Sequence, residues 1–571
     1  MTTYQITWPK STLRRHSVCK TPLKIIFINP PIRWFDMSPV LAWISMKSYY
    51  QHYGKYQDSV EWLDPVYKWD QYQTVEEVYM DCIDADVYLF SSYVWNYDLC
   101  DKLAAHIKQK NPNAICLLGG PMIGTNDKEM LSQRTMYDYI LQPTQPGEPF
   151  LAAFIDSYFD NNGEIDIQQL PWELRSTKTC SQFMPDYSVY EENKDLLVRL
   201  HEYAVAKNIR FNISFETTRG CPFKCTFCEW GGGIGSTKII KKPLDVVEKD
   251  MKLLQSIGFT VVESCDANFG IFKERDLEIF QMAWDIGIVL TGISAVKLTN
   301  YEKKKELLDN WFDIIVASEF YKTNSFTREW DVVPILSMQT ASELAIKNTN
   351  RVDLSAKDKL KLAEHCNNRR KELNLEPVAT DFILGMPGST VDDFYSEYEI
   401  MWKLDDYLNS KYIYMILPDT EVSHPDYLKK HNIELVKVNA DFYNAVRPAE
   451  NLYKNRTVEY YTISSCSTLN KNQRCEIWIM NFVANDILKI YYQQFQSQVS
   501  TKDFMKHVWY IIKTLPFFLE LWDYAQDLFD PATPSRNVEP VFLGTDYRLF
   551  GEWVTQMYGE EIQTKLKKIF H

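Results

Sequence analysis

The sequence predicts an α/β protein with an N-terminal parallel-sheet domain, a partial (β/α)6 barrel and a mainly helical C-terminal region. Three observations predict this class. The chain has 571 residues, which is too many for one hydrophobic core. Its hydrophobic content of 45% excludes a disordered chain. Short apolar runs alternate with helical stretches over most of its length, which favours parallel sheets covered by helices.

The first domain is expected over residues 1–155. Strands are predicted at 24–29, 85–91 and 114–118, with helices near 41–52 and 99–110. This alternation predicts a Rossmann-like sheet, whose ligands bind at the carboxyl ends of the strands.

Three of these strand ends carry small or turn-forming residues. They are Asn29-Pro-Pro, Ser91-Ser92 and Gly119-Gly120. Backbone can approach a ligand closely at such points, although a glycine pair alone also suits a plain turn.

A polar, proline-containing segment at 156–205 is predicted as a linker, and the barrel is expected at 206–420. Six strands are predicted near 211–217, 259–265, 289–296, 332–338, 378–384 and 411–417. Six βα units make a partial barrel, and the loops after its strands should carry the site. Residues 421–571 are predicted as a mostly helical cap domain, because 475–495 and 505–525 are amphipathic.

Cys221, Cys225 and Cys228 form the most informative pattern. They are spaced as CxxxCxxC in a loop directly after the first predicted barrel strand. Three thiolates leave one position of a metal centre open to a non-protein ligand, and chemistry can occur there. A structural zinc knuckle is the alternative, but closed zinc sites usually show paired CxxC or Cys/His spacings.

This loop resembles the signature of the radical S-adenosylmethionine (radical SAM) superfamily, in which an aromatic residue precedes the last cysteine, here Phe227. The resemblance implies that the three cysteines bind a [4Fe-4S] cluster and that the methionine end of SAM chelates the fourth iron. It also implies that Phe227 packs near the adenine. The resemblance covers roughly residues 24–420.

Four further strand ends resemble superfamily motifs in the expected order. Asp266 is expected to hold the amino group or carboxylate of SAM, and Gln339 to touch its ribose. Gly385 belongs to a motif whose backbone flanks adenine, and Leu417 suits the sixth strand. Each pattern alone also fits a plain turn, whereas their shared order is hard to explain by turns.

The first domain resembles the cobalamin-binding domain that precedes the barrel in a large radical SAM subfamily. The resemblance rests on the three strand ends above together with Gly147-Glu-Pro-Phe, and implies that Ser91, Ser92, Gly119 and Gly120 contact cobalamin. An Asp-x-His-x-x-Gly motif is missing. The implied cobalt therefore has no histidine on its lower face, or the domain keeps the fold without the cofactor.

The implied activity is cleavage of SAM to a 5′-deoxyadenosyl radical, with cobalamin-dependent methyl transfer to an unactivated carbon as the favoured subtype. One alternative is a cobalamin-independent radical SAM oxidoreductase, rearrangement or methylthiolation enzyme. Methylthiolation usually needs further cysteines for an auxiliary cluster, and the sequence has no second close group. A non-catalytic Fe-S/SAM-binding sensor is the other alternative, and a test of SAM cleavage by the reduced protein separates it from an enzyme.

Composition limits the partners and the compartment. The net charge of −14 disfavours long nucleic acids. The late apolar segment 507–522 is interrupted by charged residues and proline, so no membrane span is expected. Only three of the twelve cysteines are closely clustered, which favours reduced thiols and a cytoplasmic protein. A small-molecule, peptide or nucleoside substrate fits the chain, and the resemblance implies an electron donor such as flavodoxin or ferredoxin.

Overall fold

A computed structural model describes most of the chain. The described residues are 14–15, 20–31, 36–37, 41–123, 134–141, 147–165, 183–211, 213–230, 239–293, 300–324, 335–404, 410–418, 420–440, 452, 458–483, 486–538 and 547–570. They form two compact units. The first unit comprises Met1–Pro222, Glu229–Asp266 and Phe442–Val458, and the second comprises Phe223–Cys228, Ala267–Asp441 and Glu459–His571.

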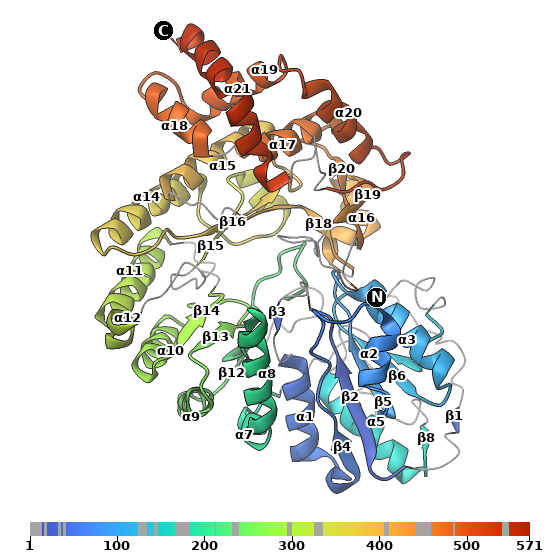
Figure 1. Ribbon diagram of the computed structural model, residues 1–571. Helices are drawn as coiled ribbons and strands as arrows, with labels where there is room; N and C mark the ends of the chain where they lie inside the picture. The colour runs from blue at the N-terminus through green and yellow to red at the C-terminus, as the bar shows by residue number, and fades with distance from the viewer. Residues whose placement is uncertain are drawn as a thin grey trace. The chain divides into compact units, whose positions relative to one another are not determined.

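A parallel sheet forms the centre of the first unit, with strand order β4-β2-β5-β6-β7 (Figure 1). Its strands are β2 (Leu23–Ile28), β4 (Val60–Trp62), β5 (Val87–Ser91), β6 (Ile115–Gly119) and β7 (Tyr139–Ile140). All five residues of β5 are buried, because helices cover both faces of a parallel sheet.

Two pairs of helices cover this sheet. The helices are α1 (Leu41–Tyr53), α2 (Val75–Asp81), α3 (Tyr97–Lys110) and α5 (Gly147–Asp160). α1 packs against α5, and α2 packs against α3. Alternate residues of β2, β5 and β6 share one core with α2 and α3, among them Ile26, Tyr88 and Cys116.

The range predicted as a linker, 156–205, contains much regular structure. It includes the end of α5, all of α7 (Ser188–Glu192) and most of α8 (Lys194–Lys207). Leu196, Leu197 and Leu200 of α8 are buried, so helical spacing of a few apolar residues outweighs the polar composition of this stretch.

The first barrel strands complete the first unit. β10 (Ile213–Phe215) pairs in parallel with β13 (Val261–Ser264), and α9 (Leu244–Ile257) connects them. A short antiparallel ladder of β11 (Thr218–Arg219) and β12 (Ile240–Lys241) frames the start of the cysteine loop.

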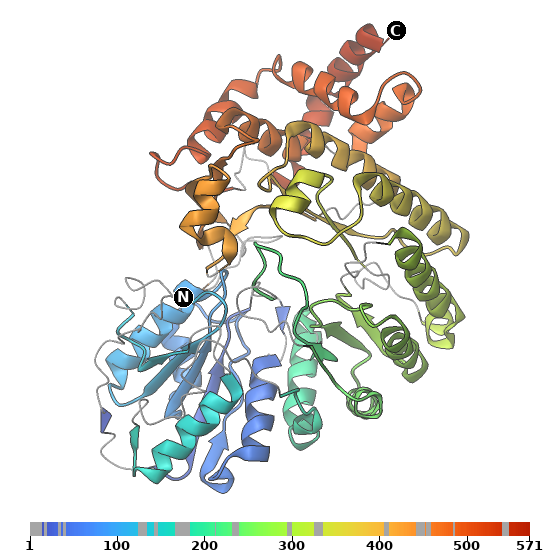
Figure 2. The ribbon, with the colours of Figure 1, turned by 180° about the vertical axis from the view of Figure 1, so that it is seen from behind.

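The second unit holds the later barrel strands. β15 (Leu336–Gln339), β16 (Thr380–Leu384) and β17 (Ser410–Ile413) form a parallel sheet in that order. The chain reaches them through α10 (Lys273–Ile286), β14 (Val289–Thr291) and α11 (Tyr301–Ala317). α14 (Ala356–Glu372) packs between α11 and α15 (Val391–Leu404), as both views show (Figures 1 and 2).

The C-terminal part of the second unit is mainly helical, as predicted, but it also contributes strands. β18 (Met415–Ile416) pairs antiparallel with β20 (Val458–Ser465), which lies beside β19 (Glu434–Ala440). The helices are α17 (Lys471–Val483), α18 (Asp486–Phe495), α19 (Thr501–Ile512), α20 (Phe518–Leu528) and α21 (Tyr547–Phe570). Within the described ranges, none of the helices combines the length and apolar character that crossing a membrane requires.

Candidate functional site

The approach to the cysteine loop is shaped by Asp266 in the first unit. β10 and β13 are parallel neighbours, so their carboxyl ends lie side by side. The buried Asp266 carboxylate accepts hydrogen bonds from Thr217 N at 2.7 Å, from Thr218 N at 2.9 Å and from Thr217 Oγ1. Asp266 thus lies at the predicted strand end and orders the backbone before Cys221. A direct role in SAM binding stays a prediction.

Arg219 joins the segment before Cys221 to α5, the helix that begins with Gly147-Glu-Pro-Phe. Its guanidinium pairs with Glu148 of α5 at 2.7 Å and with Glu216 at 2.8 Å. Burial disfavours the charge of Arg219, but the two carboxylates outweigh burial and raise its pKa. Ser45 of α1 also donates a hydrogen bond to Glu148 at 2.5 Å. The residue two positions before Cys221 is therefore tied to two helices of the Rossmann-like domain.

The cysteines themselves lie in well-packed loop segments. Cys221, in the first unit, and Cys225, in the second, are each 2% exposed, and Cys228 is half-buried. In the second unit Thr226 N donates to Thr349 O at 2.9 Å, and Val422 N donates to Thr226 O at 3.0 Å. The described residues contain no group of three or more His, Cys, Asp or Glu arranged as a metal site. The [4Fe-4S] ligands therefore stay a prediction.

Three predicted SAM contacts lie in the second unit around the ends of β16 and β18. Phe227 lies edge-on to Tyr414, with ring centroids 5.9 Å apart. Gly385 follows β16 directly and has φ of +69°, a conformation that favours glycine. Leu417 follows β18, and its carbonyl accepts a hydrogen bond from Thr420 Oγ1 at 2.7 Å. Their roles in SAM binding stay predictions.

Gln339, at the end of β15, is held in a strained backbone conformation. Its φ is +60°, which is uncommon outside glycine and is concentrated at functional sites. The buried Lys359 ammonium donates to the carbonyls on both sides of Gln339, those of Met338 and Thr340, at 2.7 Å each. Lys359 also pairs with the buried Asp353 at 2.9 Å. These contacts fix the end of β15, where Gln339 is predicted to contact the ribose of SAM.

The predicted cobalamin contacts line the carboxyl edge of the Rossmann-like sheet. Ser91 and Gly119 are register partners, and Ser92 N donates to Gly119 O at 2.7 Å. Gly120 has φ of +109°, and a Cβ there would lie 2.3 Å from Ser92 O. The Ser92 hydroxyl is fully buried and has no hydrogen-bond partner among the residues that the structure describes. A buried hydroxyl without a partner is costly, so it fits a site that a polar ligand completes.

Asn96 also belongs to this edge, although the sequence analysis did not identify it. Its fully buried side-chain amide donates to Pro30 O at 2.9 Å and to Ser91 O at 3.1 Å, and its Oδ1 accepts from Tyr93 N at 2.7 Å. The amide therefore joins the ends of β2 and β5. An asparagine just before a helix is usually a helix cap, so the sequence did not indicate that Asn96 joins two strand ends.

Tyr93 brings this edge close to the barrel strands of the same unit. Its ring stacks on Trp95 with centroids 4.5 Å apart. Burial raises the pKa of the Tyr93 hydroxyl, and the nearby Cys265 at the end of β13 raises it further. The ligand edge of the Rossmann-like sheet and the carboxyl end of β13 are thus neighbours.

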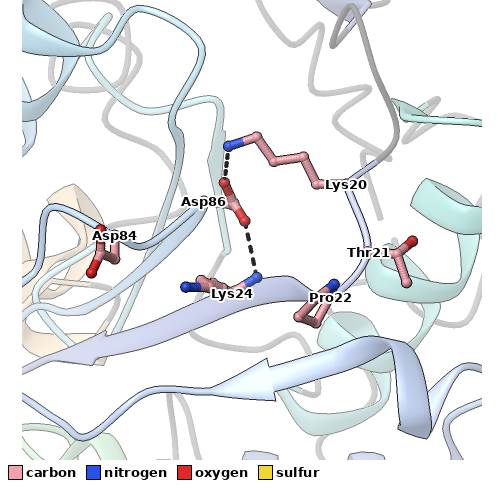
Figure 3. A pocket seen from close by; sticks show the side chains of 6 residues that line it. All are labelled: Lys20, Thr21, Pro22, Lys24, Asp84 and Asp86. Carbon is pink, nitrogen blue, oxygen red and sulfur yellow. Dashed lines mark hydrogen bonds and ion pairs between the residues drawn. The ribbon is translucent and has the colours of Figure 1, made fainter.

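A separate hollow lies at the opposite end of the Rossmann-like sheet. Figure 3 shows that it is lined by Lys20, Thr21, Pro22, Lys24, Asp84 and Asp86. Asp86 accepts hydrogen bonds from the Lys20 ammonium and, at 3.0 Å, from Lys24 N. These residues precede β2 and β5 or begin them, whereas ligands of parallel sheets bind at the carboxyl ends. The hollow therefore does not belong to the predicted site.

The sequence of the chain is similar to those of known methyltransferases. No family model matches it. The cobalamin-dependent radical SAM methyltransferase TokK of Streptomyces tokunonensis is 22% identical over 442 residues. The 2-(S-pantetheinyl)-carbapenam-3-carboxylate methyltransferase of Streptantibioticus cattleyicolor is 23% identical over 442 residues. Both alignments cover 72% of this chain and only 58% of the relative.

Two solved structures share the fold. The radical SAM methyltransferase TsrM from Kitasatospora setae, with cobalamin and a [4Fe-4S] cluster bound, has a TM-score of 0.51 and 12% identity. The match covers 77% of this chain and 88% of TsrM. The cobalamin-dependent radical SAM enzyme OxsB, with aqua-cobalamin bound, has a TM-score of 0.53 and 12% identity over 97% of this chain and 82% of OxsB.

These comparisons confirm the predicted fold class and the resemblance to radical SAM proteins with an N-terminal cobalamin-binding-like domain.

Proposed function

We propose that the chain is a cobalamin-dependent radical SAM methyltransferase that acts on an unactivated carbon of a small molecule. Cys221, Cys225 and Cys228 would hold the [4Fe-4S] cluster. Phe227, Asp266, Gln339, Gly385 and Leu417 would bind SAM, and Ser91, Ser92, Gly119 and Gly120 would bind cobalamin. When bound, these groups supply a radical that abstracts hydrogen and a methyl group that replaces it.

The observation that carries this proposal is the Arg219 ion-pair network. Methyl transfer through two cofactors requires that both sites open toward one substrate, so the two loops that hold them must keep a fixed distance. Arg219 pairs with Glu148 of α5 and Glu216 of the cysteine-loop approach. Its side chain is only 20% exposed, so solvent weakens these pairs little.

Residues on both sides fit the proposed cofactors. On the cobalamin side, the glycine turn at Gly120 offers a close backbone surface. The Ser92 hydroxyl, which no described residue hydrogen-bonds, offers one polar contact. On the SAM side, Lys359 and Asp266 fix two strand ends through backbone hydrogen bonds. Pre-ordered backbone of this kind binds a ligand without a large entropic cost.

The remaining assignments follow the same proposal. The domains are 1–155 for cobalamin, 156–205 for the connection, 206–420 for the barrel and 421–571 for a cap. A flavodoxin or ferredoxin would supply electrons in the cytoplasm. The two relatives described above are named as methyltransferases, which favours methyl transfer over rearrangement, oxidation or a sensor role. Methylthiolation stays the alternative, because three further relatives, 22–26% identical, are named tRNA-2-methylthio-N(6)-dimethylallyladenosine synthases.

Cofactor loading tests the proposal. Protein reconstituted anaerobically with iron, sulfide and hydroxocobalamin should retain one [4Fe-4S] cluster and one cobalamin per chain. Cys225→Ala should lose the cluster and keep the cobalamin, because the two groups bind to different segments. Cys225 is chosen for this variant because it is buried, whereas Cys228 is half-buried. Retention of iron by Cys225→Ala, or no cobalamin in the wild type, would count against the assignment.

A further inference from the structure

Arg474, in the first half of α17, is a buried cation that lacks a carboxylate partner among the described residues. Its side chain is part of the interior, with 4% of the residue exposed. Its Nε is buried and has no hydrogen-bond partner in the described part of the chain, and its Nη2 donates to Cys466 Sγ at 3.6 Å. Arginine keeps its proton in proteins, and a fully buried arginine is almost always paired.

The guanidinium lies directly against the end of β16. A Cβ added at Gly385 would be only 1.9 Å from Arg474 Nη1, so only glycine lets the guanidinium lie there. Ligands of parallel barrels bind at this end of the strands. Arg474 is thus placed where a bound molecule is expected, and the described residues supply no carboxylate to neutralise it.

Tyr414 connects this position to the cysteine loop within the second unit. It is 1% exposed, and its ring contacts Phe227 at 5.9 Å between centroids. Its backbone N donates to Leu384 O at 3.3 Å, next to Gly385, against which Arg474 lies. Arg474 is therefore one side chain away from the loop that carries Cys225.

Cys466 does not remove the need for an anion. A neutral thiol is a weak acceptor, and the other neighbour of this thiol is the Thr468 hydroxyl at 3.5 Å. An ionised Cys466 would be the competing partner of Arg474. Burial opposes its ionisation, but the guanidinium and hydrogen bonds outweigh burial, so the pKa of this thiol lies below its ordinary value of 9.0. The variants below therefore separate a thiolate partner from a bound carboxylate.

We propose that Arg474 binds the carboxylate of a small molecule held beside the cysteine loop at the end of β16. The carboxylate belongs either to SAM or to the substrate. This inference rests on the proposed function, because only a radical SAM reaction brings both molecules to this loop. The guanidinium offers two parallel N–H groups, which match a carboxylate.

The test compares Arg474→Met, Arg474→Lys and wild type, with Arg536→Met as a matched control. Arg536 is an arginine of the same unit that forms an exposed pair with Asp527 at 2.7 Å. Two quantities are measured on the anaerobically reconstituted protein. One is the affinity for SAM and for 5′-methylthioadenosine, which lacks the carboxylate. The other is the melting temperature without either ligand.

If SAM supplies the carboxylate, Arg474→Met should bind SAM about 10- to 100-fold more weakly. It should bind 5′-methylthioadenosine as the wild type does, and Arg474→Lys should lose less affinity for SAM. If the substrate supplies it, the affinity for SAM stays unchanged. In both cases Arg474→Met should melt at the same or a higher temperature without ligand, because a buried unpaired charge has been removed.

A lower melting temperature of Arg474→Met with unchanged SAM affinity would overturn the inference and assign Arg474 to an ion pair with Cys466. Arg536→Met should match the wild type in both measurements. Failure of the wild type itself to bind SAM would instead contradict the proposed function, so the two failures are distinct.

Discussion

Replacing Arg219 by methionine tests whether an ion pair holds the cysteine loop to the Rossmann-like domain. The change would leave Glu148 and Glu216 buried without their cation, at 10% and 3% side-chain exposure. Removing one partner of a buried ion pair costs about 3 to 5 kcal/mol. Because Arg219 itself is one-fifth exposed, we expect the lower end, a loss of about 3 kcal/mol in the free energy of unfolding.

The loss should depend on pH in a definite direction. In the wild type, burial opposes ionisation of Glu148, but Arg219 and hydrogen bonds lower its pKa below the ordinary value of 4.5. This contribution to stability is present above that value and is lost as the pH falls through the lowered pKa. In the variant, burial alone would raise the pKa of both carboxyl groups, so stability would fall as the pH rises. The difference between the proteins should therefore be larger at pH 8 than at pH 5.

Urea unfolding at both pH values measures this difference. Arg199→Met is the matched control, because Arg199 forms an exposed pair with Asp64 at 2.8 Å in the same unit. Exposed pairs contribute less than about 1 kcal/mol. A loss in Arg219→Met no larger than in the control, and equal at both pH values, would refute the proposed role of Arg219.

Three further predictions concern single residues. Cys225→Ala should contain little iron and should not cleave SAM, whereas wild-type iron content and cleavage in this variant would remove Cys225 from the cluster ligands. Gln339→Ala and Asp266→Ala should each bind SAM about 10- to 100-fold more weakly, and normal binding in both would mean that the strand ends are misassigned. Burial raises the pKa of Glu397 to about 8, above its ordinary value of 4.5, so wild-type stability should fall as the pH rises through this range. In thermal melts, the melting temperature of Glu397→Gln should fall less between pH 5 and pH 8 than that of the wild type. An equal fall in both proteins would contradict this role of Glu397.

Strands and strand ends were the most predictable features, because each depends on a local pattern. Apolar runs placed β5 and β16 within a few residues of their observed bounds. Gly120 was predicted at a close-approach point and Gly385 in a motif whose backbone flanks adenine, and both have the left-handed backbone conformation that glycine permits. The polar stretch before the barrel, predicted as a linker, contains α8, which its composition did not indicate.

Long-range pairing was not predictable, because no local pattern encodes it. Arg219 pairs with Glu148, 71 positions earlier, and Lys359 holds the carbonyl of Met338, 21 positions earlier. No pattern in the sequence marks Arg474, because its position against Gly385 depends on how β16 and α17 pack. Such contacts follow from the tertiary fold alone.

The central claim is that the chain uses both SAM and cobalamin. Its most direct test is product analysis after SAM is added to reduced protein loaded with the cluster and hydroxocobalamin. The proposal predicts retained cobalamin without histidine-nitrogen coupling by paramagnetic resonance, and formation of both S-adenosylhomocysteine and 5′-deoxyadenosine. Formation of 5′-deoxyadenosine alone by protein that retains no cobalamin would contradict the claim and leave a cobalamin-independent radical SAM enzyme.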